Sequence, residues 1–165
     1  MSPLAQSHGA QFTRILSLGA ARGDTVVSND DIAGPIDSSD EWIRQRTGII
    51  ERRRSSDAEQ AIDLAVRASN EAIEKAGIQP DQIGAVIVAT ISNAVQTPSL
   101  AALLADRVGA TPAAAYDISA ACAGYTYGIA QADALIRSGS ANYVLVVGAE
   151  KLSDFVEPTD RSISF

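Results

Sequence analysis

Uninterrupted apolar runs recur along the chain and predict strands that are buried on both faces. The three clearest are Gly84–Thr90, Ala113–Ile118 and Asn142–Gly148, each of strand length. Continuous rather than alternating hydrophobicity is typical of parallel sheets, because helices cover both of their faces. A shorter run at Arg14–Gly19 predicts a further buried strand, and Val26–Val27 predicts a brief extended piece.

Segments with helical spacing lie between these runs. Alanines recur every three or four residues over residues 61–76, and Ser56–Glu59 before them has the form of a capping box. Thr97–Pro98 predicts the cap and first residue of a helix that reaches about Val108, and residues 125–136 predict another helix. Strands that alternate with helices predict an α/β fold with a mainly parallel mixed sheet.

Two shorter helices are predicted closer to the amino terminus. Asn29–Asp31 is placed to cap one of them, while Ser39 or Asp40 caps the other, which ends at Thr47–Gly48. The one basic cluster, Arg52–Arg54, follows and predicts a solvated loop. A docking surface for an acidic carrier protein is the weaker alternative for this cluster.

The composition is that of a globular protein with one domain. The chain has 165 residues, of which 46% are hydrophobic and 20% charged, enough to bury a proper core. Residues 1–12 predict a flexible leader, which leaves residues 13–165 for the domain. The sequence contains neither a signal-peptide pattern nor an apolar run of about 18 residues, which favours a cytoplasmic location.

Charge and rare residues narrow the classes of function. The formal net charge of −7 argues against nucleic acids and anionic membranes as partners, because both attract clustered Lys and Arg. The single cysteine, Cys122, excludes an internal disulfide framework, and with only one histidine, His8, no metal site is expected. His8 lies in the predicted leader, so a Cys–His catalytic pair is hard to build from it.

Cys122 is the residue most able to carry chemistry. It stands where a predicted strand passes into a predicted helix, and its neighbours over residues 120–124 are alanine and glycine, which leave room for a substrate. A helix start supplies partial positive charge and free N–H groups, which favour a thiolate and can hold an oxyanion. The alternative is a buried cysteine that serves as a small hydrophobe. The residues alone leave both interpretations open.

Three motifs in order give the sequence a family resemblance. Asp117–Gly128 around the cysteine closely resembles the nucleophile segment of ketoacyl-acyl-carrier-protein synthase III, a member of the thiolase-like superfamily. Ile36–Ile49 and Pro158–Arg161 agree with the same family, and the resemblance is collinear from Arg14 to Phe165. It implies the amino-terminal half of a layered αβαβα fold, ending in a strand that begins near Ile163.

The resemblance also implies a reaction. Cys122 would accept an acyl group from coenzyme A, and malonyl-acyl-carrier protein would then lose carbon dioxide and attack the thioester. The family supplies the enolate-stabilising histidine and asparagine from its second half. The implied partners are acyl-coenzyme A, acyl carrier protein, a complementary carboxy-terminal half and a homodimer mate, with coenzyme A as part of the substrate and no permanently bound cofactor.

Five further positions match binding residues of the family. Trp42, Arg46 and Arg161 match residues that line the coenzyme A entrance, and Ser38 matches a position near the same nucleotide. Without the resemblance, the tryptophan would be a packing residue and the arginines solvated. Thr97 matches a position that reaches across the dimer into the acyl pocket, where threonine leaves space for longer or branched primers; its alternative role is helix capping.

Two other functions stay open at this point. One is a relative that transfers acyl groups without condensing them. The other is a non-catalytic half-domain that serves as a binding or assembly partner.

Overall fold

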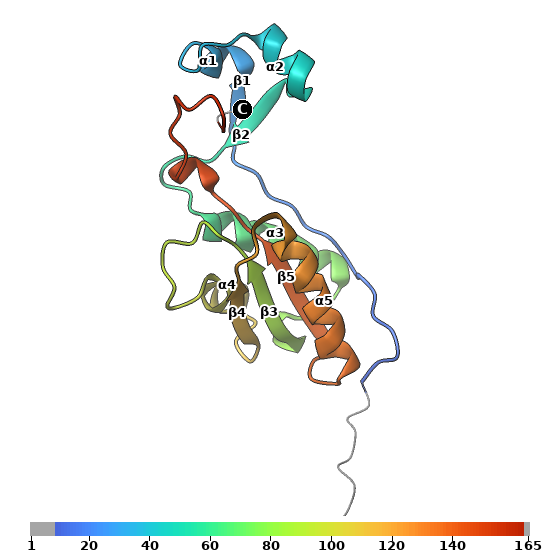
Figure 1. Cartoon of the computed structure of the whole chain (residues 1–165). Coiled ribbons are helices and arrows are strands. Elements are labelled where there is room, and N and C mark those ends of the chain that lie inside the picture. The colour runs from blue at the N-terminus through green and yellow to red at the C-terminus, as the bar shows by residue number, and fades with distance from the viewer. Residues whose placement is uncertain (1–8, 164–165) are drawn as a thin grey trace, which may run out of the picture. The chain divides into compact units, whose positions relative to one another are not determined.

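The computed structural model describes residues 9–163, and they divide into two compact units (Figure 1). We call the first the sheet unit; it comprises the described residues up to Ala21 together with Ala61–Glu150. The second, the hairpin unit, comprises Arg22–Gln60 together with the described residues from Lys151 onwards. No helix within the described residues is long and apolar enough to cross a membrane.

A three-stranded parallel sheet forms the centre of the sheet unit. Strand β3 (Ile83–Ala89) lies between β4 (Ala114–Ile118) and β5 (Tyr143–Gly148), and all three run in the same direction. The register pairs Ala89 with Ile118 on one side and with Gly148 on the other, so the three strands end together. The predicted parallel α/β arrangement is therefore confirmed.

Helices cover both faces of this sheet, as the continuous apolar runs require. Helices α3 (Ala61–Ala76) and α4 (Leu100–Val108) share a buried cluster with Val86 and Val88 of β3. Helix α5 (Gly124–Arg137) packs on the opposite face, over Ile87. At Gly128 a Cβ atom would lie 2.7 Å from Cγ1 of Val146, so only glycine lets α5 approach the sheet this closely.

The hairpin unit has a small core of its own. Strand β1 (Thr25–Ser28) pairs antiparallel with β2 (Glu51–Arg54), and helices α1 (Asn29–Ala33) and α2 (Asp40–Thr47) lie between them in sequence. Ser39 caps α2, and Gly48 ends it in the left-handed conformation, as predicted. The buried cluster contains three isoleucines against which Trp42 packs: Ile32, Ile36 and Ile43. The part of the two units that the structure describes also contains three short 3-10 turns: η1 (Pro80–Gln82), η2 (Ala121–Ala123) and η3 (Leu152–Asp154).

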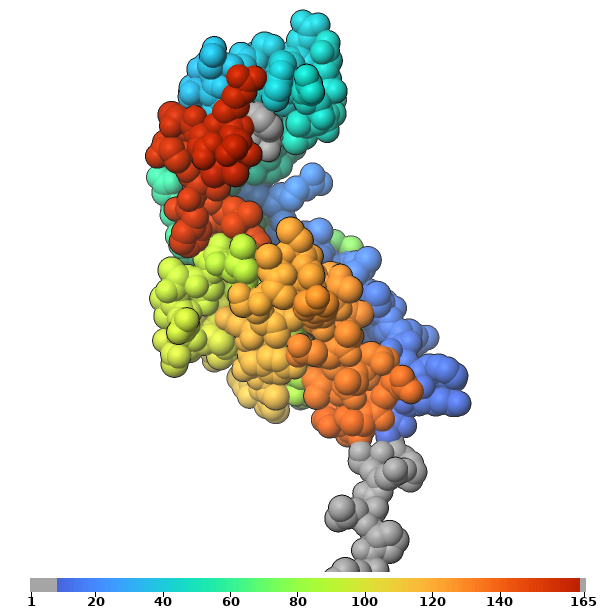
Figure 2. Space-filling model, viewed as in Figure 1, coloured from blue at the N-terminus to red at the C-terminus, as the bar shows by residue number. Residues whose placement is uncertain are grey.

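The strand predicted at Arg14–Gly19 does not form. Residues 9–21 run as an extended segment along the flank of the sheet unit, beside α5 (Figure 2). Its contacts go to helices rather than to a strand: Thr13 Oγ1 donates to Asp133 of α5, and Ser17 Oγ donates to the carbonyl of Ala72 in α3. Because no strand lies beside it, the apolar side chains that predicted burial stay exposed.

Other local predictions need correction. Arg52–Arg54 is not a loop but strand β2, because β1 provides an antiparallel partner that the sequence did not reveal. Helix α3 begins at Ala61, so Ser56–Glu59 forms a turn before it rather than its cap. Thr97–Pro98 likewise precedes α4, whose cap is Ser99.

Two predictions concern residues at or beyond the ends of the described part of the chain. Ile163 lies in a turn, where its N–H donates to the carbonyl of Asp160, and the rest of the strand predicted there is outside the described residues. His8 and most of the predicted leader, residues 1–8, are also outside them.

Candidate active site

Cys122 is exposed on a tight turn at the end of strand β4. It is the middle residue of η2, and α5 begins two residues later at Gly124. Ala121 before it has a φ of +44°, in the left-handed region that costs a residue with a side chain about 1–3 kcal/mol. Within residues 9–163, this strained turn leaves the thiol exposed rather than packed among apolar side chains.

The start of α5 rests directly on the end of β3. A Cβ atom at Gly124 would come within 3.0 Å of the Ala89 side chain, so the glycine permits close contact. The N–H of Gly124 donates to the carbonyl of Ala121, and no side chain caps the helix. The cysteine is thus held beside the positive end of a fourteen-residue helix, which favours negative charge on its sulfur or on a bound oxyanion.

The loop that leaves β3 is held at its beginning by Glu150, just after β5. The carboxylate of Glu150 accepts hydrogen bonds from the N–H of Ile91 at 2.9 Å and the N–H of Ser92 at 3.0 Å. The hydroxyl of Ser92 also donates to this carboxylate, as does that of Thr90 at 3.3 Å. Four donors on one carboxylate fix the path of the chain beyond the sheet.

The far end of the same loop is held by Asp117, on the strand that leads to the cysteine. Its two carboxylate oxygens accept hydrogen bonds from the N–H groups of Leu100 and Ala101, each at 2.8 Å. The Asp117 side chain therefore caps α4 together with Ser99. Thr97 lies between the two anchors, exposed, with a cis peptide bond to Pro98.

Trp42 in the hairpin unit lies beside two arginines. The guanidinium carbon of Arg161 is 4.5 Å from the centre of the indole ring, and that of Arg46 is 5.7 Å away. Both distances fit cation–π contacts. Trp42 is half-buried against the isoleucine cluster, so packing, the alternative role, accounts for only part of its surface. Residues far apart in sequence thus form one aromatic and cationic surface.

Ser38 lies close to the start of α2. Its hydroxyl oxygen is buried and has no hydrogen-bond partner within residues 9–163. Asp37 before it has a φ of +49°, again in the left-handed region. An orphaned buried hydroxyl costs free energy unless something pairs with it, so this position is available to a ligand or to water.

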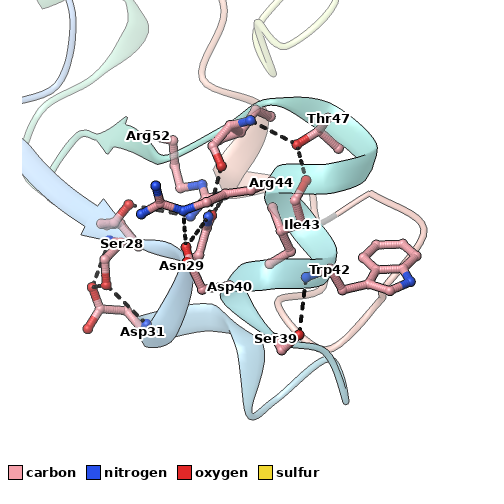
Figure 3. A network of polar contacts seen from close by, with 12 residues as sticks. Ser28, Asn29, Asp31, Ser39, Asp40, Trp42, Ile43, Arg44, Thr47 and Arg52 are labelled. Carbon is pink, nitrogen blue, oxygen red and sulfur yellow. Dashed lines mark hydrogen bonds and ion pairs between the residues drawn. The ribbon is translucent and has the colours of Figure 1, made fainter.

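A polar network holds α2 against α1 and β2 (Figure 3). The hydrogen bond from Arg44 lowers the pKa of Asp40 below its ordinary value of 3.8, and the hydrogen bond from Asn29 adds to the effect. Burial lowers the pKa of Arg52, whose guanidinium donates to the side-chain oxygen of Asn29. These groups carry their charges at neutral pH.

The structure thus gathers some predicted residues and adds others. Trp42, Arg46 and Arg161 meet in the hairpin unit, while Cys122 and Thr97 lie on segments that leave the same edge of the sheet. Three side chains were missed as parts of these sites: Asn29, Asp117 and Glu150. Asp117 and Glu150 stand at the carboxyl ends of parallel strands, the edge where sites form in such sheets, so their position after apolar runs could have identified them in the sequence.

Among residues 9–163, no group of three or more His, Cys, Asp or Glu side chains is placed to hold a metal ion.

Comparisons of sequence agree with the resemblance drawn from the motifs. The family described as 3-oxoacyl-[acyl-carrier-protein (ACP)] synthase III matches residues 116–165. The β-ketoacyl-[acyl-carrier-protein] synthase III of Kocuria rhizophila is 54% identical over the whole chain, which covers 46% of that protein. That of Tropheryma whipplei is 50% identical over 155 residues, covering 94% of this chain and 48% of the relative. The chain spans about half the length of the curated relatives it matches.

Solved structures give the same result for the fold. The priming β-ketosynthase of the R1128 polyketide biosynthetic pathway superposes with a TM-score of 0.94 at 39% identity, over 98% of this chain and 48% of that protein. The 3-oxoacyl-[acyl-carrier-protein] synthase III of Aquifex aeolicus superposes with a TM-score of 0.87 at 41% identity, over 92% of this chain and 49% of that protein. The thiolase-like α/β fold predicted from the motifs is confirmed.

Proposed function

Because the chain corresponds to the amino-terminal half of ketoacyl-acyl-carrier-protein synthase III, a condensing enzyme of the thiolase-like superfamily, we propose that it carries the acyl group of a chain-initiating condensation on Cys122. The observation that carries the proposal is the exposed thiol on the strained turn between β4 and α5. The pathway is fatty-acid or polyketide initiation, in keeping with the names of the relatives.

The first step is acyl transfer from coenzyme A. The Cys122 thiolate attacks the thioester carbonyl, a new S–C bond forms, and the bond to the coenzyme A sulfur breaks. Coenzyme A leaves as a thiolate and takes up a proton. The helix start beside Cys122 favours the attacking thiolate and the oxyanion of the tetrahedral intermediate.

The second step is condensation. Malonyl-acyl-carrier protein loses carbon dioxide, and the electron pair of the broken C–C bond becomes an enolate that attacks the acyl-cysteine carbonyl. The Cys122 thiolate then leaves. An enolate needs hydrogen-bond donors, and the histidine and asparagine expected in that role belong to the complementary carboxy-terminal half. His8 is the one histidine in the chain and lies in the predicted leader.

Trp42 and Arg161 are the proposed adenine-binding pair for coenzyme A. A base held between two planar groups needs about 7 Å between them, two van der Waals contacts of roughly 3.5 Å. The present separation of 4.5 Å is too short, so Arg161 must withdraw as the base enters. Arg46, whose guanidinium carbon is 5.7 Å from the ring centre, supplies a cation for the phosphates. The unpaired hydroxyl of Ser38 supplies a hydrogen-bond donor for the phosphates or the sugar.

The complementary half is proposed to complete the sheet. Among the described residues, strand β5 pairs with a strand on one edge only, that of β3, and its other edge has no strand beside it. A groove of about 980 Å3 is lined by β5, by α3 and α5, and by residues of the segment 10–21. Phe12, Ile15 and Leu18 of this segment are 64–78% exposed, which favours cover by a further strand. A homodimer in which Thr97 borders the acyl pocket of the mate remains part of the proposal.

The acyl-transfer step is tested by peptide mapping after incubation with acyl-coenzyme A. We expect an acyl adduct on Cys122, the only cysteine, and a slower oxygen-ester adduct in Cys122→Ser. Unchanged acylation in Cys122→Ala would refute the proposal. Addition of the carboxy-terminal half should then start carbon dioxide release from malonyl-acyl-carrier protein.

Acyl transfer without condensation is the second candidate function. This step needs only a thiolate and an oxyanion site, which Cys122 and the start of α5 would supply. Acylation without carbon dioxide release, even with the complementary half present, would select it. Absence of acylation in both states would leave a non-catalytic assembly role.

A further inference from the structure

Asn29 is a buried polar side chain with three well-formed hydrogen bonds. It is the first residue of α1 and only 1% exposed. Its Nδ2 donates to Oδ1 of Asp40 and to the carbonyl of Ile49, each at 2.8 Å. Its Oδ1 accepts from Nη2 of Arg52, also at 2.8 Å (Figure 3). Three of the four bonds open to an asparagine are made.

The partners of Asn29 bracket helix α2. Asp40 is its first residue, Ile49 follows the glycine that ends it, and Arg52 lies on the strand that comes next. One side chain therefore ties down both ends of an eight-residue helix. Asp40 is in turn bonded to Arg44 within the helix, at 2.7 Å.

Trp42 lies on the helix that is held in this way. The backbone N–H of Trp42 donates to the capping hydroxyl of Ser39. The side chain packs against the cluster that contains Ile43 and stays half-exposed. Arg46 lies on α2 as well and would move with Trp42, whereas Arg161 lies outside the helix. A rotation or slide of α2 would therefore turn the indole away from Arg161. The orientation of the ring therefore depends on what fixes the two ends of the helix.

We propose that Asn29 is a positioning residue for coenzyme A binding, which holds α2 so that the Trp42 ring faces Arg161. This inference rests on the proposed function, because it assigns Asn29 to the nucleotide site of the same reaction. Asn29 does not touch the ligand; it acts through the helix.

The experiment uses the 165-residue chain and the fluorescence of Trp42, its only tryptophan. Asn29→Ala and Asp40→Ala each remove the hydrogen bond between the two side chains, one from either partner. Asp40→Ala is less disruptive to folding, because the Asp40 side chain is 35% exposed. Asp40→Asn keeps an oxygen that accepts the Asn29 bond. Ser28→Ala is the matched control, since it removes the adjacent cap of α1 without touching α2.

Two measurements decide the inference. Without ligand, quenching of Trp42 by acrylamide should rise about twofold in Asn29→Ala and Asp40→Ala and stay unchanged in Ser28→Ala. On titration with coenzyme A, the dissociation constant should rise about tenfold in the two alanine variants, as expected for the loss of one to two hydrogen bonds. Asp40→Asn should bind within about twofold of wild type.

The outcomes separate this inference from the proposed function. Binding to Trp42→Ala, which has no tryptophan, is measured by titration calorimetry beside the wild type. If the two bind coenzyme A equally, the proposed nucleotide site is wrong and the role of Asn29 in it falls as well. If Trp42→Ala weakens binding but Asn29→Ala does not, only the positioning role is wrong. If Asn29→Ala and Ser28→Ala lose the same affinity for coenzyme A at equal thermal stability, Asn29 only stabilises the fold and has no positioning role.

Discussion

Removal of the Asp117 carboxylate should destabilise the sheet unit more than removal of any ordinary helix cap. Asp117 accepts the N–H groups of Leu100 and Ala101, the first two residues of α4, while Ser99 satisfies the third. Leu100 is 3% exposed and Ala101 is fully buried, so water has little access to the N–H groups that would lose their partner. A buried donor left without an acceptor costs its full desolvation penalty.

The magnitude follows from these two bonds. Hydrogen bonds to a charged group contribute about 1.5–3 kcal/mol each, so loss of the two bonds in Asp117→Ala should lower the free energy of unfolding by about 3–6 kcal/mol. Ser99→Ala removes one neutral cap and should cost about 1 kcal/mol. Asp117→Asn keeps one acceptor oxygen but turns an amide NH2 towards the second N–H, and its cost should fall between the two.

Urea denaturation of the chain measures these differences. We expect the urea midpoint to be highest for the wild type and to decrease through Ser99→Ala and Asp117→Asn to Asp117→Ala. The slope of the free energy of unfolding against urea concentration should be the same for all four proteins. Reactivity of Cys122 should fall in parallel in the Asp117 variants, since the same strand leads to the thiol. A cost for Asp117→Ala no greater than that for Ser99→Ala would refute the reasoning, because the carboxylate would then be replaceable by water.

Three further predictions concern other parts of the molecule. The pKa of Asp40 in the folded chain lies below its ordinary value of 3.8, so the ionised carboxylate stabilises the fold above pH 3.8, and this stabilisation is lost as the pH falls through the folded-state pKa. Trp42 emission should therefore stay constant from neutral pH to about pH 4 and change only at lower pH. Gly128→Ala should destabilise the chain by about 1–2 kcal/mol in a urea titration, because overpacking against Val146 outweighs the gain in helix propensity; a stabilised variant would contradict this. Thr97→Phe should depress the use of longer or branched primers about tenfold relative to acetyl, by the steric cost of overpacking, and a uniform loss for all primers would contradict the role in the acyl pocket.

The sequence by itself determined the features that depend on neighbouring residues. Continuous apolar runs identified β3, β4 and β5, since a strand covered on both faces needs no polar alternation. Gly48 was predicted to end a helix, and it adopts the left-handed conformation that glycine permits. The position of Cys122 at a junction between a strand and a helix was also predicted correctly, because the apolar run before it and the helical spacing after it are both local patterns.

Tertiary structure decided where partners from elsewhere in the chain were needed. The segment 14–19 has the composition of a strand, yet a strand exists only when another lies beside it, and within the described residues none does. The arginines at 52–54 have the composition of a loop, yet residues 25–28 pair with them.

The same distinction holds for the candidate sites. Cys122 and Trp42 were visible as unusual residues in recognisable motifs, but the roles of Asn29, Asp117 and Glu150 depend on hydrogen bonds across 11 to 60 positions of sequence. Periodicity and capping patterns report on backbone conformation within a few turns and on which face is buried. They carry no information on which distant donor a buried carboxylate or amide will meet, because that is set only when the elements pack together.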